Sequence, residues 1–208
     1  MVTRTFERVA GGCAYVVAAG GVAYGIAFVE TVRSGPKWAA TTAALLLLLG
    51  GVVGAVVVVA LFGRLRESDP SFAVLGAAVG LVAVFGAAIH GGFDLAVIAH
   101  PPARPFDAPN PVDPRGLMTF GMAGVSLGVA AWLVLSGGGL PRWMGWLAAA
   151  SAVLLEVIYV GRLTILDPKN PVLLAAAVLE GLIVNPAFYV SLGVQLRRGA
   201  PAGAAPPS

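Results

Sequence analysis

Six apolar segments, each long enough to cross a membrane as a helix, run through this chain with short polar connections between them. Hydrocarbon about 30 Å thick is crossed by roughly 20 helical residues, and in lipid only helices and closed barrels satisfy every backbone polar group. The composition agrees, since 58% of the 208 residues are hydrophobic and only 11% are charged. We therefore predict an all-α, polytopic transmembrane bundle with spans at about residues 9–29, 38–62, 72–99, 117–135, 143–163 and 171–196.

The spans are expected to form a single domain over residues 1–198. Arg4 and Arg8 precede the first apolar run as in a signal peptide, but the run is too long for a signal-peptide core and lacks a clear small-residue cleavage site. We therefore expect a retained first span. The proline-rich tail at 199–208 offers nothing to bury and is expected to be disordered.

The Lys and Arg residues indicate the surroundings of the chain. They are scattered beside the apolar segments, as span-flanking charges are, so we expect the lipid bilayer as partner and no binding of nucleic acid. With the N-terminus in the cytoplasm, that side carries seven of the 13 cations and the other side six, which weakly favours cytoplasmic N- and C-termini. With Cys13 as the single cysteine and two histidines, we expect neither a metal site nor a cofactor.

Two further patterns have structural explanations. The stretches NPVDPRG at 110–116 and DPKNPV at 167–172 each lead into a helix, where Asp113 or Asn170 would cap the first N–H groups and the following proline would lose no hydrogen bond. Glycines four residues apart allow helices to approach closely, and we interpret them as packing positions. These pairs are Gly21/Gly25, Gly50/Gly54, Gly76/Gly80 and Gly124/Gly128.

Polar residues inside the spans are the candidates for function. An ionisable group in hydrocarbon costs several kcal/mol and usually faces the interior of the bundle. The ionisable residues are His90, Asp94, Glu156, Arg162 and Glu180, and their neutral companions are Tyr159 and Asn185. The helical rise per residue places these residues in the half of the bundle that would face outward. They could form one polar pocket there, or each could have a separate structural role.

His90 and Asp94 lie four residues apart and therefore share one helix face. An aspartate beside an imidazole fixes its tautomer and favours its charged form, which suits proton handling or cation binding. The alternative is an interfacial pair that anchors the end of a long helix. His100, next to Pro101, is interpreted as a loop residue.

Glu156 and Glu180 are predicted to lie at similar depth on neighbouring antiparallel helices. Two carboxylates in low dielectric cannot both stay charged without a cation, a proton or Arg162 nearby. Tyr159 lies close to the face of Glu156 and could bind it, whereas Arg162 could instead extend to the headgroups. Asn185 precedes a mid-span proline, which removes a backbone hydrogen bond and can expose a carbonyl group to a cavity.

Five short segments of the chain resemble a family of bacterial six-span membrane proteins of unknown function. These segments are HGGFDLA, NPVDPRGLMTFG, LPRWMGWL, YVGRL and NPAFYVSLGVQLRRG. The likeness covers roughly residues 72–198. It implies six spans and a bacterial inner (plasma) membrane, and it implies no chemistry.

A second resemblance implies a chemical mechanism. The order of His90-xxx-Asp94, LEVIY and VNPAFYV is similar to that in emopamil-binding proteins and sterol isomerases. It implies that His90 and Asp94 form a proton-donor pair, that Glu156 faces a cation and that Asn185 forms a pocket wall. Asp94 stands where that family has Glu, and Phe188 and Tyr189 stand where a tryptophan is expected.

The leading hypothesis is therefore a membrane protein whose pocket binds or transports a small solute, cation or proton. Asp94, Glu156, Glu180 and His90 would carry this function, and a homodimer would give so small a bundle room for alternating access. The second hypothesis is an intramembrane lipid- or sterol-type isomerase with His90 and Asp94 as acid–base residues, so the sequence leaves open whether the protein is an enzyme. The third is an accessory or scaffold subunit in which every polar residue is structural.

Overall fold

The computed structural model describes residues 2–101, 114–137, 139–167 and 169–198, and this part of the chain forms helices and no strand. Six helices are long and apolar enough to cross a membrane, which confirms the all-α class and the number of spans. The uninterrupted spans are α1 (Arg4–Ser34), α2 (Lys37–Leu65), α3 (Pro70–Ala99) and α6 (Arg142–Ile165). The predicted disorder at 199–208 and the predicted cap at Asp113 lie outside the described residues.

Two spans contain a wide, π-helical turn. The fourth runs through α4 (Pro114–Gly116), the π-helical segment η1 (Leu117–Gly121) and α5 (Met122–Leu135). The sixth runs through α7 (Pro171–Leu179), the π-helical segment η2 (Glu180–Val184) and α8 (Asn185–Arg198). Pro186 cannot donate a backbone hydrogen bond, and the π-helical turn lies directly before Asn185 and this proline, whereas the chain after them continues as a regular α-helix.

Most helices extend a few residues beyond the predicted apolar runs, and at several ends a capping group marks the boundary. The side chain of Asn170 accepts hydrogen bonds from the N–H groups of Val172 and Leu173, with Pro171 in the first turn, which confirms the cap predicted at this loop. Asp69 caps α3 in the same way. Gly35 ends α1 at a positive φ of 62°, and its N–H donates to the carbonyl of Thr31.

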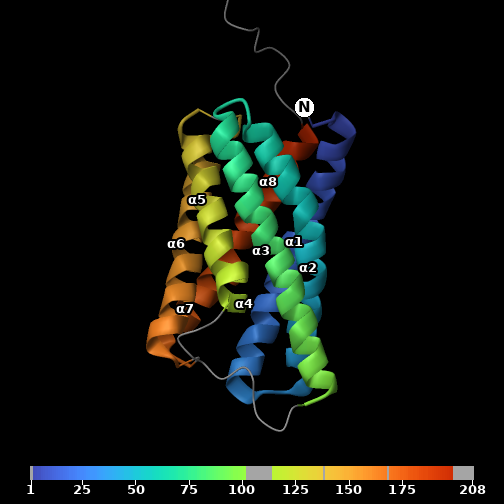
Figure 1. Ribbon diagram of the computed structural model, residues 1–208, viewed down its shortest axis with the longest axis vertical. Helices are drawn as coiled ribbons and strands as arrows, with labels where there is room; N and C mark the ends of the chain where they lie inside the picture. Colours follow the sequence, from blue (N-terminus) through green and yellow to red (C-terminus); the bar gives the residue numbers. More distant parts are fainter. Residues whose placement is uncertain (1, 102–113, 138, 168, 199–208) are drawn as a thin grey trace, which may run out of the picture.

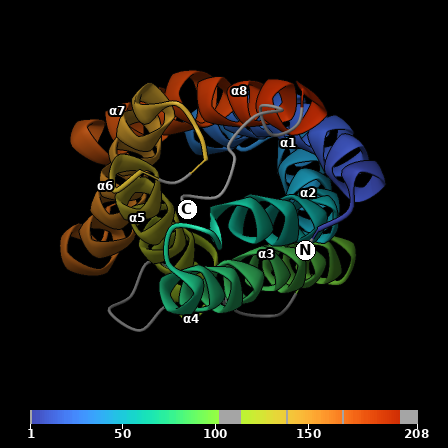
Figure 2. The ribbon, with the colours of Figure 1, turned by 90° about the horizontal axis from the view of Figure 1, so that it is seen from above.

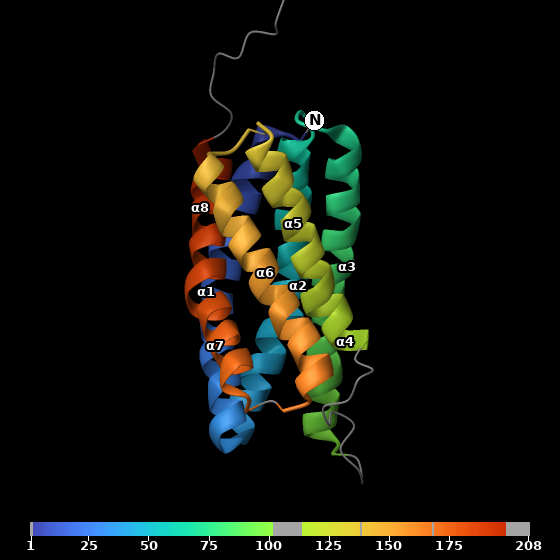
Figure 3. The ribbon, with the colours of Figure 1, turned by 90° about the vertical axis from the view of Figure 1, so that its left-hand side faces the viewer.

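The spans form a ring in chain order (Figures 1 and 2). Each span packs against the next one in the chain, and α8 closes the ring by packing along α1. Figure 3 shows α5 and α6 running side by side on one flank. A closed ring gives each helix an interior face, and this arrangement can enclose a site between non-adjacent spans.

Glycine brings α2 and α3 into backbone contact. A Cβ atom added to Gly51 would overlap the carbonyl oxygen of Val84 and would lie 2.7 Å from the backbone nitrogen of Ala88. The neighbouring Gly50 has no atom within 4 Å of such a Cβ. Small residues at helix crossings increase van der Waals contact, which is a main source of helix association in lipid.

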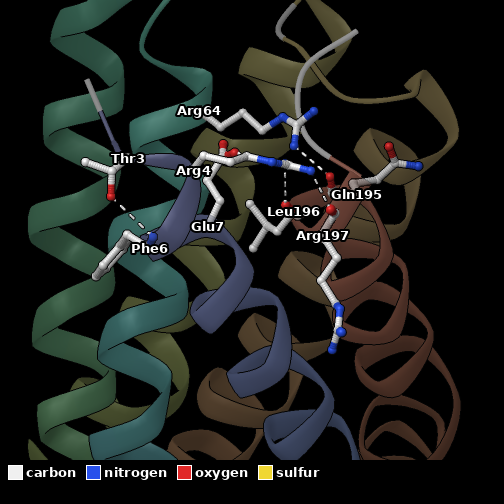
Figure 4. Close-up of polar contacts among 8 residues, drawn as sticks. All are labelled: Thr3, Arg4, Phe6, Glu7, Arg64, Gln195, Leu196 and Arg197. Carbon is white, nitrogen blue, oxygen red and sulfur yellow. Dashed lines mark hydrogen bonds and ion pairs between the residues drawn. The ribbon is translucent and has the colours of Figure 1, made fainter.

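The end of the bundle that carries the N-terminus is densely packed. The largest fully buried side chains concentrate toward this end and include Leu65, Leu133, Met144, Leu192 and Leu196. Arg4 donates hydrogen bonds to the carbonyl oxygens of Leu196 and Arg197, and Arg64 donates to that of Gln195 at 2.8 Å (Figure 4). The last carbonyl groups of α8 therefore find partners on α1 and α2, which ties three helices together at this end.

The two adjacent glycines of α2 offer a matched test of this packing. Gly51→Ala should lower the free energy of unfolding by about 1–3 kcal/mol, because the added methyl group forces α2 and α3 apart. Gly50→Ala should be neutral or stabilising by up to about 1 kcal/mol, because alanine favours the helix and meets no neighbour. Thermal unfolding of the two variants in the same detergent measures the difference, and equal melting temperatures would contradict this crossing.

Candidate functional site

A cavity of about 560 Å³ occupies the half of the ring opposite the N-terminus. Its lining comes from all six spans and extends from mid-bundle to Thr31 near the end of α1 and Asp167 just after α6. Many lining positions on facing helices hold small residues, among them Gly21, Gly25, Ala123 and Gly181. The ring is therefore filled by large side chains at one end and hollow at the other.

The cavity wall is largely apolar, with a limited set of polar groups. Aromatic and aliphatic side chains such as Phe28, Leu47, Phe120 and Ile158 supply most of the surface. The polar members of the lining are Tyr24, Thr31, His90, Asp94, Thr119, Arg162, Asp167, Glu180, Asn185 and Tyr189. Five of the predicted site residues, His90, Asp94, Arg162, Glu180 and Asn185, are thus brought to one cavity by α3, α6, η2 and α8.

Glu180 is the most enclosed acid of the cavity. It begins η2, and 4% of its surface is exposed. Its Oε1 atom accepts hydrogen bonds from the Ser151 hydroxyl at 2.5 Å and from the Asn185 amide at 3.3 Å. Its Oε2 atom is buried and has no hydrogen-bond partner, and the structure shows no ion pair for this side chain within the described residues.

A second polar cluster joins α3 to the start of the fourth span. The imidazole of His90 contacts Asp94 Oδ2 through Nε2 at 3.5 Å and Thr119 Oγ1 through Nδ1 at 3.3 Å. Because a carboxylate accepts hydrogen, Asp94 favours the tautomer with a proton on Nε2, and the Thr119 hydroxyl then donates to Nδ1. The other oxygen of Asp94 accepts from Arg115 at 3.0 Å.

Arg115 also stacks over Phe93, with its guanidinium carbon 4.3 Å from the ring centroid. It thus holds the beginning of the fourth span against α3 through both charge and aromatic contact. Asp94 therefore already has a cationic partner, whereas Glu180 has none among the described residues. Asp94 and Glu180 differ in this respect although both line the cavity.

Each π-helical turn carries one of the polar groups of the cavity. Thr119 lies within η1 and Glu180 begins η2, and both are buried. A π turn shifts the residues that follow it around the helix axis, and such turns are frequent at functional sites. The apolar periodicity of these spans gives no sign of either turn.

Glu156 and Tyr159 lie outside this cavity. Glu156 lines an open groove on the outer surface of the bundle between α5 and α6, together with Gly124 and Gly128. Its Oε1 atom is buried against Gly124 and has no hydrogen-bond partner. The ring of Tyr159 packs on Gly121. The predicted meeting of Glu156 with Glu180 is thus not what the structure shows.

Helix rotation explains the separation of the two glutamates. Ser151 faces Glu180, and five residues along an α-helix turn a side chain by about 140°, so Glu156 faces away from the interior. The emopamil-binding likeness assigns the cation-facing role to Glu156, and that residue does not reach the cavity. His100 caps the end of α3 and is exposed, as expected for a loop residue.

Several polar contributors to the site were not predicted from the sequence: Tyr24, Thr31, Arg115, Thr119, Ser151, Asp167 and Tyr189. Ser151 and Thr119 are isolated hydroxyl residues in largely apolar sequence, a weak signal because such groups often bond their own helix. Tyr189 was noted only as an aromatic neighbour of Asn185. Among the described residues no group of three His, Cys, Asp or Glu side chains could hold a metal ion.

Comparisons of the chain with protein-family models, with curated proteins and with solved structures find no match.

Proposed function

We propose that this integral membrane protein binds a small, largely apolar organic cation in the cavity, as the loading step of a solute carrier. Two observations on one residue carry the proposal: Glu180 lines the cavity, and its buried Oε2 atom has no hydrogen-bond partner among the described residues. Buried carboxylates are normally paired with a cation or hydrogen-bonded on both oxygens. A ligand cation would supply a partner for this carboxyl group.

The size and lining of the cavity support an organic ligand rather than a bare ion. Small-molecule sites typically enclose about 300–1,000 Å³ and combine apolar walls with few polar groups, and this cavity of about 560 Å³ lies within that range. Phe28, Phe120 and Ile158 would contact an apolar body while Glu180 meets its charge. The lining carries three acids, Asp94, Asp167 and Glu180. Asp94 is paired with Arg115, whereas the carboxyl group of Glu180 has no cationic partner among the described residues.

The packed end of the ring supports loading from one side. Leu65, Leu133 and Met144 fill the interior near the N-terminus, whereas the cavity extends to Asp167 at the opposite end. We place the protein in a bacterial inner membrane with both termini in the cytoplasm, so that the cavity lies in the outer half. A homodimer would supply the second surface against which a six-span carrier can move.

Glu180→Gln should weaken binding of tetraphenylphosphonium, a permanent organic cation, at least about tenfold, because an amide keeps the shape but removes the charge. Glu156→Gln is the matched control, since it makes the same change on the outer face and should leave affinity unchanged. Equilibrium dialysis of the purified variants measures both values. Equal affinity in Glu180→Gln, or an equal loss in Glu156→Gln, would contradict the proposed site.

The chain of hydrogen-bonding groups from Thr119 through His90 to Asp94 supports a second candidate function. An imidazole held in one tautomer by a carboxylate can take a proton from a hydroxyl group or from a bound substrate. We propose, as the alternative, acid–base chemistry on a lipid- or sterol-type molecule in the same cavity, with His90 as the proton-transfer residue.

The enzymatic alternative predicts a change in membrane lipids. Extracts of cells that express His90→Ala should accumulate a substrate that the parent protein converts, because the alanine removes the proton acceptor beside Thr119. His100→Ala is the control, as that histidine is exposed at the end of α3. Identical lipid profiles by mass spectrometry in parent and His90→Ala cells would eliminate the isomerase.

A further inference from the structure

We infer that Glu180 exchanges a proton for the bound cation, so that loading releases one proton for each cation taken up. The inference rests on the proposed function, since it assigns the coupling chemistry of the same site. It is drawn from the hydrogen bonds of the carboxyl group and from the distribution of charge around the cavity.

The hydrogen bonds of Glu180 specify where its proton resides in the empty cavity. Oε1 accepts from both Ser151 and Asn185, so its acceptor positions are occupied by donors. Oε2 is buried and has no donor, and Glu180 lines a largely apolar cavity, where an uncompensated negative charge would cost several kcal/mol. A neutral carboxyl group with its hydrogen on Oε2 is consistent with both observations.

The charged and titratable groups around Glu180 do not replace a ligand cation. On the elements packed against it or across the cavity these groups are Tyr24 on α1, Arg162 on α6, Asp167 after α6, Tyr189 on α8, and His90 and Asp94 on α3. Arg162 shares the cavity but forms no ion pair with Glu180, and Asp94 is paired with Arg115. Glu156 and Tyr159 on α6 lie outside the lining, and neither α7 nor the lining residues of α2 contribute an ionisable group.

The exchange balances in atoms and charge. The cation approaches Oε2, the O–H bond of the carboxyl group breaks, and the proton passes to water at the end of the cavity marked by Asp167. The resulting carboxylate pairs with the cation, while Ser151 and Asn185 continue to donate to Oε1. The site is therefore neutral before and after loading, and no uncompensated charge remains in the interior.

The exchange predicts that proton release accompanies binding of tetraphenylphosphonium. This cation has no titratable proton, so a proton released into weakly buffered detergent solution must come from the protein, and a pH-sensitive dye should report about one proton for each bound cation. Because protons compete with the cation, affinity should fall by up to about tenfold for each unit by which pH is lowered. Tetraphenylborate, an anion of similar shape, should release no proton.

Variants identify the residue that releases the proton and distinguish failure of the exchange from failure of the proposed function. Glu180→Gln, compared at equal occupancy by cation, should release none, whereas Glu156→Gln should release as much as the parent protein. Loss of release in His90→Gln with retention in Glu180→Gln would overturn the inference by moving the proton to His90. Binding to the parent protein without proton release would overturn the exchange alone, whereas no binding by the parent protein would overturn the proposed function.

Discussion

Hydrocarbon offers no hydrogen-bond partner, and this constraint shapes both the backbone and the polar side chains of the protein. The six spans satisfy their internal backbone groups as helices, and Arg4 and Arg64 satisfy the last carbonyl groups of α8. Ser126 likewise donates to the carbonyl of Gly76 on α3. Within the described residues, the buried side-chain oxygens left without a partner are Glu156 Oε1 and Glu180 Oε2.

These two carboxyl groups show how the surroundings of one chemical group determine its role. Glu180 lies inside the ring, receives two hydrogen bonds and faces a cavity with room for an organic molecule. Glu156 lies on the outer surface, where an open groove between α5 and α6 offers small and aliphatic residues. The same residue type thus has an enclosed site in one case and the outer surface of the bundle in the other.

The sequence predicts those features that follow directly from the order of residues along the chain. Span number follows from the length of apolar runs, and the cap at Asn170 follows from a local motif followed by proline. The direction in which the Glu156 side chain points could not be derived in the same way. The position of a residue along a helix does not specify how the helix is rotated about its axis within the bundle. The π turns at Thr119 and Glu180 add a further rotation that hydrophobic periodicity does not record.

The contacts between neighbouring helices could likewise not be derived from the sequence alone. Four-residue glycine spacing predicts that Gly50 and Gly54 form the packing face of the second span. In the structure Gly51 and Gly54 approach α3, whereas a Cβ atom added to Gly50 would meet no atom within 4 Å. The run of Gly50, Gly51 and Gly54 allows two faces, and the choice between them depends on where Val84 and Ala88 lie on the partner helix. Only the three-dimensional pairing of the two helices contains that information.

The asymmetry between a packed end and a hollow end sets the energetics of any transport. Movement of a ligand past Leu127 and Leu155, which line the inner end of the cavity, requires the interdigitated side chains beyond them to separate. The sixth span is the element suited to such a change, because η2 and Pro186 interrupt its hydrogen bonding beside Glu180. In the proposed exchange Glu180 would stay neutral at that step, because a protonated site and a cation-occupied site both avoid the cost of carrying a net charge through the low-dielectric interior.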